Sequence, residues 1–427
     1  MRSNIQKMME KADKIWGNTS FRSLVTESIF LIVFAIYMTY YYLDTTMFEI
    51  EWSEHFFSYM QLALLVSILA RYITTNLGDL KNTILLFIIF PVLLIAYHNV
   101  AYGHLISNAL LIAGVYGIYY KKICRVYLLV SIPITIYTVL ASQLGWVTNL
   151  IYNQDGRIRE SFGFIYPTDF AAHLFFMIVV WVLLRGLKCT YWEVAGMVLV
   201  VLFLHFKSDT RCSEITILLI AFVIVVLKLI NAKKKKGMES YQLPLLLKLG
   251  CISLPFIFAS TMALLCRFYN PENSFMLFLD KLLTGRLKLG KRTFDNYDTT
   301  LWGQYIDMYG NGGTLEKPEY YTFIDCSYIN ILMRFGLIVF CVVILIIITV
   351  MMKNMNNTLI LLAISIVCLH SMIEHHLFEF YYNIFIILPL ASFENNTEMS
   401  IHLSLKNKKE KTGKYKVQRG ILKCLFM

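Results

Sequence analysis

Four arginines are the residues of this sequence most suited to binding an anion. They are Arg157, Arg159, Arg211 and Arg286, and each stands in a polar connection between long apolar segments. A guanidinium is permanently charged and presents a planar fork of N–H donors that matches phosphate oxygens. Several forks around one point would hold a pyrophosphate without a metal ion. Each arginine also has acids nearby in the sequence, so simple ion pairing with Asp155, Glu160, Asp209 or Glu214 stays open.

Acids and histidines near the same connections are candidates for proton transfer. Asp169 and His173 stand four residues apart, on one face of a helix, where they would pair with each other or orient a ligand. Asp325 is a candidate to accept a proton, although an ordinary aspartate pKa of about 3.9 makes it a weak base unless burial raises that value. The run Glu374-His375-His376 lacks the His-Glu-x-x-His spacing of a zinc helix. The nine cysteines are scattered singly, so no metal site is expected.

The composition places these residues in a membrane protein. The 427 residues are 57% hydrophobic and only 16% charged, whereas soluble domains carry about 25% charged residues. Continuous apolar runs recur along the chain, each near the roughly 20 residues that a bilayer requires of a helix. The sequence therefore predicts an all-α integral membrane protein. A net charge of +11 fits basic cytoplasmic ends, and nucleic acid binding is not expected.

We expect about 12 transmembrane helices, and the basic residues predict that both termini are cytoplasmic. The expected spans are centred near Val33, Leu65, Ile89, Leu111, Pro133, Met177, Leu199, Phe222, Pro255, Val343, Ile364 and Phe385. The expected regions are a cytoplasmic N-terminus (1–22), spans 1–9 (23–265), a large outer loop (266–325), spans 10–12 (326–393) and a basic cytoplasmic tail (394–427). The outer loop is long enough for a small helical cap, with an amphipathic helix over 275–283.

Four stretches resemble one protein family in their order and spacing. They are Arg159 to His173, Ser208-Asp-Thr-Arg211 with the following Cys-Ser-Glu, Leu283-Thr-Gly-Arg286-Leu, and Asp325 to Gly336. Together they resemble the bacterial capsule and exopolysaccharide polymerases of the Wzy family, within the O-antigen polymerase and ligase superfamily. Asn383 and Pro389 add a weaker likeness. Ligase-type members carry a histidine where this chain has Asp325, which favours a polymerase.

The resemblance implies a GT-C-like glycosyltransferase of the bacterial cytoplasmic (inner) membrane. Such an enzyme moves a growing glycan from its polyprenyl pyrophosphate carrier to the next lipid-linked repeat unit on the outer face. It implies catalytic roles for Arg211, Arg286, Asp325 and Arg159, and substrate-binding roles for Arg157, Asp169, His173, Ser208 and Tyr328. No cofactor and no metal are expected, so activity should survive a chelator.

The expected partners are polyprenyl-pyrophosphate-linked oligosaccharide and membrane lipids, with a chain-length regulator and a flippase of the same pathway as further candidates. Two other functions stay open: a transporter that flips lipid-linked oligosaccharides, and a ligase that transfers a finished glycan to a different acceptor. Transporters often consist of two related halves. Here one long outer loop interrupts only the second half, which favours an enzyme.

Overall fold

The computed structural model describes residues 19–53, 55–74, 80–100, 102–154, 156–233, 241–316 and 319–394. Most of the expected N-terminal region, the lysine run after position 233 and the tail from 395 onward lie outside these residues. Asp155, one of the acids near Arg157 in the sequence, also lies outside them.

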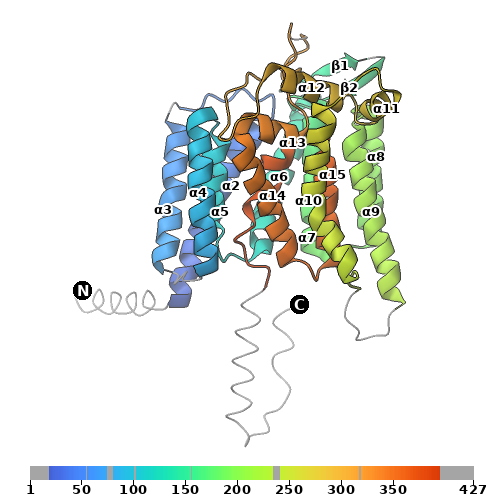
Figure 1. The fold of residues 1–427 in the computed structure, drawn as a ribbon. Coiled ribbons are helices and arrows are strands. Elements are labelled where there is room, and N and C mark those ends of the chain that lie inside the picture. The colour runs from blue at the N-terminus through green and yellow to red at the C-terminus, as the bar shows by residue number, and fades with distance from the viewer. Residues whose placement is uncertain are drawn as a thin grey trace, which may run out of the picture.

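Long helices stand side by side through the molecule (Figure 1). They are α2 (Thr19–Leu43), α3 (Phe56–Thr74), α4 (Leu80–Val100), α5 (His104–Gly114), α6 (Tyr120–Gln143), α7 (Pro167–Arg185), α8 (Tyr191–Lys207), α9 (Arg211–Ala232), α10 (Leu245–Arg267), α14 (Gly336–Lys353) and α15 (Thr358–His370). Within the described ranges, 7 helices are long and apolar enough to cross a membrane, while the apolar parts of α4, α5 and α15 are shorter. The chain is therefore a mostly helical, multi-pass membrane protein.

The outward faces of these helices carry large apolar side chains. Leu129, Phe206, Phe222 and Leu246 are each exposed on the surface of the bundle. Exposed apolar area of this extent would be unfavourable in water, and hydrocarbon is the solvent that suits it. The count of 12 spans stays a prediction.

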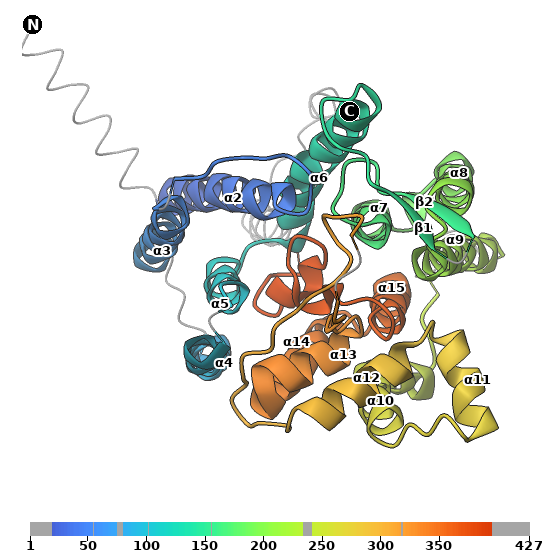
Figure 2. The ribbon, with the colours of Figure 1, turned by 90° about the horizontal axis from the view of Figure 1, so that it is seen from above.

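The chain after α15 differs from the expected last span. An α-helix centred near Phe385 was expected, but residues 371–394 form only two short 3₁₀ turns, η3 (His376–Phe378) and η4 (Ile384–Ile387), joined by irregular backbone. We call residues 371–391 the central segment. Nearly all of it is buried by surrounding protein, and in Figure 2, seen down the helices, it lies beside α14 and α15 near the middle of the bundle.

Polar side chains take over the role of helical hydrogen bonds in the central segment. The Asn108 side-chain amide donates to the carbonyl of Phe378 at 2.7 Å, and the Tyr127 hydroxyl donates to the carbonyl of Tyr382 at 2.9 Å. The Asn383 amide donates to the carbonyl of Leu377 at 2.7 Å. Irregular backbone is tolerated at membrane depth only where such partners replace water. The sequence shows apolar residues here, but it cannot show that protein rather than lipid covers them.

A small cap covers one end of the bundle (Figure 1). It contains an antiparallel hairpin, β1 (Ile151–Gln154) with β2 (Arg157–Glu160), and two helices, α11 (Ser274–Leu282) and α12 (Arg286–Asn296). The hairpin is an exception to the expected all-α fold. The amphipathic helix expected over 275–283 is present as α11, where the Asn273 side chain accepts hydrogen bonds from the first turn. After the cap, α13 (Ser327–Asn330) and a π-helical turn, η2 (Ile331–Phe335), lead into α14.

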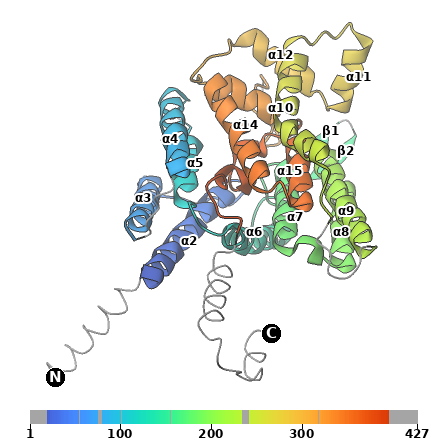
Figure 3. The ribbon, with the colours of Figure 1, turned by 60° about the horizontal axis from the view of Figure 1, so that its bottom comes forward.

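The opposite end of the bundle collects basic residues. Arg71, Arg185 and Lys353 lie in the last turns of α3, α7 and α14, and Lys121 lies in the first turn of α6. This end is turned towards the viewer in Figure 3. Basic residues gather on the cytoplasmic side of membrane proteins, so the pattern predicts that the cap is outside.

Cysteine labelling tests this orientation. In a variant without native thiols, Glu316→Cys in the cap should react with a membrane-impermeant maleimide added to intact cells, because its side chain is exposed at the capped end. Lys233→Cys, exposed at the basic end, should react only after the cells are opened. If intact cells label the Lys233→Cys variant and leave the Glu316→Cys variant unlabelled, the predicted orientation is reversed.

A second prediction concerns the support of the central segment. Tyr127→Phe removes only the buried hydroxyl that donates to the Tyr382 carbonyl, so it should cost about 1–3 kcal/mol of stability through an unsatisfied buried acceptor. Tyr137→Phe, at an exposed tyrosine of the same helix, is the matched control and should cost little. Thermal unfolding of both variants in detergent is the measurement, and equal melting temperatures would contradict the proposed support.

Candidate functional site

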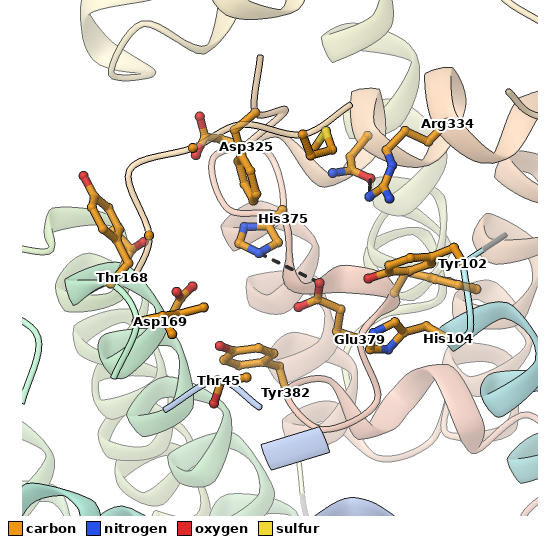
Figure 4. A pocket seen from close by; sticks show the side chains of 18 of the residues that line it. Thr45, Tyr102, His104, Thr168, Asp169, Asp325, Arg334, His375, Glu379 and Tyr382 are labelled. Atoms are coloured by element: carbon orange, nitrogen blue, oxygen red, sulfur yellow. Dashed lines mark hydrogen bonds and ion pairs between the residues drawn. The ribbon is translucent and has the colours of Figure 1, made fainter. Parts of the chain in front are cut away.

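A cavity of about 440 Å³ lies at the capped end, between the helices and the cap. Small-molecule sites typically occupy about 300–1,000 Å³, so this volume suits a substrate head group. The described part of the wall comes from the end of α2, the start of α5, the start of α7, the cap with the loop that leads to α13, the end of α13, η2 and the central segment. Figure 4 shows how side chains from these parts face one another around the hollow.

Among the described residues, the cavity wall carries more acids than fixed positive charges. Its carboxylic side chains are Asp44, Asp169, Asp325 and Glu379, while Arg334 is the arginine among the lining residues. His104 and His375 add imidazoles, and aromatic rings cover much of the remaining wall. An anionic ligand in this cavity therefore needs positive charge in addition to Arg334.

Arg334 reaches the cavity from the π-helical turn η2. Its guanidinium carbon lies 4.7 Å from the centre of the Tyr102 ring, and Nη1 donates to the Asn330 side-chain oxygen at 3.4 Å. Within the described residues, its buried Nε has no hydrogen-bond partner. A buried N–H without a partner is costly, and a guanidinium on the cavity wall is a group suited to an anion.

A tight backbone contact fixes the position of η2. Gly336 follows the turn with φ +88°, and a Cβ there would lie 2.3 Å from the backbone nitrogen of Gly303. The backbone of Gln304 also donates to the carbonyl of Arg334 at 2.8 Å. The loop that contains Gly303 and Gln304 thus packs directly on η2, the turn that carries Arg334. Turns of the π-helical type are frequent at functional sites.

Asp325 lines the cavity as expected, and Arg286 lies behind it. The Asp325 carboxylate accepts a hydrogen bond from the Tyr321 hydroxyl at 3.0 Å and lies 3.5 Å from Nη1 of Arg286. Arg286 also donates through Nε to the carbonyl of Ile373 at 2.9 Å. Burial lowers the pKa of Arg286, but the carboxylates of Asp325 and Glu374 more than offset this and raise it above the ordinary value.

Arg159 belongs to the same electrostatic neighbourhood. Burial raises the pKa of Glu374, while the positive charges of Arg286 and Arg159 oppose that rise. Arg159 is itself buried, with Nε donating to the carbonyl of Ser208 and its guanidinium 5.5 Å from the centre of the Tyr166 ring. Tyr166 lines the cavity, so Arg159 lies one layer behind the wall.

The structure does not bring Arg157, Arg211 and Ser208 to the cavity wall. Asp209 lies between the two arginines, 3.2 Å from Nη1 of Arg157 and 3.4 Å from Nε of Arg211. The Arg211 side chain is 63% exposed. The Ser208 hydroxyl donates to the carbonyl of Glu160 and supports the contact between β2 and the α8–α9 turn. The four arginines expected at one point are thus divided between the cavity side and an exposed ion pair.

Two further expected substrate ligands lie in the protein core. His173 is fully buried, with Nε2 2.8 Å from the Thr45 hydroxyl and its ring stacked on Tyr382. The Tyr328 hydroxyl donates to the carbonyl of Cys368 at 2.8 Å. Neither residue lines the cavity, so both fit a packing role better than ligand binding. Asp169, four residues before His173, does line the cavity and faces His376 instead.

The central segment supplies site residues that the sequence analysis did not select. His375 and Glu379 line the cavity, and His376 lies behind them at 3.6 Å from Asp169. Arg334 was part of a quoted motif but had no assigned role. The signal for Arg334 was its charge beside an apolar run, which is costly in a membrane and therefore usually functional. The same signal marked Glu379, an acid within the expected last span, but the sequence analysis gave it no role.

Comparison with known proteins adds no relative, since no protein-family model, no curated protein and no solved structure matches this chain.

Proposed function

We propose that the chain is a glycosyltransferase that polymerises polyprenyl-pyrophosphate-linked oligosaccharide repeat units into a capsular polysaccharide or exopolysaccharide. The reaction takes place on the outer face of the bacterial cytoplasmic membrane. The observation that carries this proposal is the cavity at the capped end of a membrane bundle, lined by aromatic rings, carboxylic acids and one arginine. The resemblance of residues 157–389 to Wzy-family polymerases supports the same function.

The lining suits a sugar joined to a phosphate group. Aromatic rings offer flat apolar surfaces to the C–H faces of sugars, and carboxylates accept hydrogen bonds from their hydroxyls. The rings come from Tyr102, Tyr166, Tyr321, Phe323, Phe335, Phe378, Tyr381 and Tyr382. The polyprenyl chain of the substrate would remain in the bilayer beside the helices, which explains why the site belongs at a bundle end.

The proposed chemistry is one substitution at the anomeric carbon of the donor. The hydroxyl oxygen of the acceptor sugar forms a bond to that carbon, and the bond from the carbon to the pyrophosphate oxygen breaks. The pyrophosphate leaves with the electron pair, and the hydroxyl proton passes to a carboxylate in the wall. Asp325 is the first candidate for this base, and the Arg334 guanidinium on the cavity wall donates to the leaving group. Arg286 acts through Asp325 as a positioning residue.

A reconstitution experiment tests the function itself. Purified protein in vesicles receives a lipid-linked repeat unit and no nucleotide sugar, and the products are sized on a gel. A ladder of longer glycans is expected, because donor and acceptor are both lipid-linked. Movement of the unchanged unit across the bilayer would instead identify a flippase, and a single transfer to another acceptor would identify a ligase.

Substitutions of the arginines test whether the reaction takes place in the cavity or at the exposed ion pair that contains Arg211. Arg334→Ala should reduce the rate about 10²- to 10³-fold, the range for losing one preorganised donor to a developing negative charge. Arg334→Lys should restore only part of the rate, because an ammonium cannot reproduce the planar fork. Arg286→Ala should also be slow, whereas Arg211→Ala should stay within a few-fold of wild type. The motif resemblance alone predicts a large loss for Arg211→Ala, so this variant discriminates between the two placements.

The matched control is Arg292→Ala, an exposed arginine on the same helix as Arg286. Polymer ladders are compared at equal protein abundance. If Arg334→Ala gives full-length ladders at the wild-type rate, Arg334 has no part in the reaction.

A further inference from the structure

Three potential metal ligands meet at the cavity wall although the sequence separates them widely. Asp169 stands in the first turn of α7, while His375 and His376 follow α15 in the central segment. One ligand atom from each residue lies within 4.8 Å of the other two. One of these approaches joins Asp169 Oδ1 and His376 Nε2 at 3.6 Å. Ligand atoms that share one zinc ion at about 2.0–2.2 Å lie about 3–3.6 Å apart, so small side-chain rotations would complete a site.

The two imidazoles each have a buried nitrogen without a hydrogen bond. These atoms are Nδ1 of His375 and Nε2 of His376, and neither has a hydrogen-bond partner within the described residues. The His376 side chain is fully buried, which makes an unused nitrogen costly unless something binds it. Nε2 of His376 is also the atom closest to the Asp169 carboxylate. A cation between these atoms would satisfy the nitrogen and the carboxylate together.

Glu379 faces the opposite nitrogens of both imidazoles. Its carboxylate lies 3.1 Å from Nδ1 of His376 and 3.8 Å from Nε2 of His375. Figure 4 shows Glu379 and His375 on one side of the hollow and Asp169 on the other. Metal-binding histidines usually donate their second N–H to a carboxylate, which fixes the tautomer and the ring orientation. The cluster therefore contains both the ligands and the group that would orient them.

The charge of the cavity gives an independent reason for a cation. Asp44, Asp169, Asp325 and Glu379 line a cavity whose lining includes one arginine. A pyrophosphate would add further negative charge to this wall, where Arg286 pairs with Asp325 and Arg334 is the arginine among the lining residues. A divalent ion beside Asp169 would lower the repulsion between the wall and such a ligand.

We propose that Asp169, His375 and His376 bind one divalent metal ion that accepts nitrogen ligands, such as zinc. Two imidazole nitrogens and one carboxylate oxygen suit zinc, manganese or iron, whereas magnesium and calcium favour sites made of oxygen alone. Asp169 and His375 line the cavity, so an ion held by them would lie at its wall. Three protein ligands with open positions are typical of a catalytic rather than a purely structural metal.

The role of the ion rests on the proposed function, whereas its binding does not. In a polymerase, the open positions would hold oxygens of the donor pyrophosphate and stabilise the charge that develops as it leaves. Chelation would then stop the reaction. This outcome is opposite to the chelator resistance that the sequence predicts, because the sequence gives no sign that Asp169 meets the two histidines.

Metal binding is measured first, without any activity assay. The full-length protein, purified without a histidine tag and stripped with EDTA, is titrated with Zn²⁺ by calorimetry and with Co²⁺, whose visible absorption reports nitrogen and oxygen ligands. One equivalent of ion should bind. A stripped protein that takes up no ion, or that binds Co²⁺ without the absorption of nitrogen ligation, would overturn the proposal.

Near-isosteric variants assign the ligands. Asp169→Asn, His375→Gln and His376→Gln should each weaken binding at least about 100-fold, and Glu379→Gln should weaken it about 10- to 100-fold as the loss of an orienting partner. The matched control is His104→Gln, a histidine of the same cavity outside the cluster, which should bind like wild type. Wild-type affinity in His376→Gln, or equal loss in His104→Gln, would refute the assignment. Monodisperse elution of each variant shows that it is folded.

The ladder assay then separates the two proposals. Chelation that removes both the bound ion and the polymer, with recovery on adding Zn²⁺ or Mn²⁺, supports the catalytic role of the ion. Polymer synthesis that continues in the stripped protein would refute that role while leaving the polymerase function intact. Stoichiometric metal binding in a protein that makes no polymer would refute the polymerase and retain the site.

Discussion

The organisation of this protein depends on how the central segment satisfies its backbone inside an apolar bundle. Each N–H and C=O removed from both water and a regular helix costs free energy unless a partner replaces the lost hydrogen bond. Asn108, Tyr127 and Asn383 provide such partners to carbonyls of the segment. Because these donors come from α5, α6 and the segment itself, the surrounding helices hold the irregular chain in one conformation.

The irregular conformation has a direct consequence for the site. On a straight helix His375, His376 and Glu379 would share one face, but nothing local would direct that face towards Asp169. The irregular path instead groups all three near Asp169 and exposes two of them to the cavity. Figure 2 shows the segment near the middle of the bundle, where side chains from both halves of the protein can reach it. The irregular backbone of the central segment, which is costly to bury, therefore brings these three polar side chains together.

The cap and the π-helical turn complete the site from the other side. Asp325 is held by Tyr321 and Arg286 at the end of the cap, and Arg334 projects from η2, where Gly303 packs against Gly336. The acids, the arginine and the imidazoles thus belong to separate elements that meet at one end of the bundle. In a water-poor cavity such charges interact more strongly than they do in water, so their balance decides which ligand can enter.

The sequence by itself determined that the chain is a helical membrane protein, that its basic connections lie at one end and that a cap with an amphipathic helix follows α10, because span length, apolarity and periodicity are local properties. It also selected Asp325 and Arg286 as candidates through the resemblance of their motifs, and Asp169 through its spacing to His173; of these, Asp325 and Asp169 line the cavity. Only the tertiary structure decided that Arg211 pairs with Asp209 away from the cavity, and that residues 371–391 form no span helix. It alone brought Asp169 to His376. The physical reason is that helix packing decides whether protein or lipid buries a segment and which distant segments meet. Helix packing is not encoded in the local periodicity of the sequence.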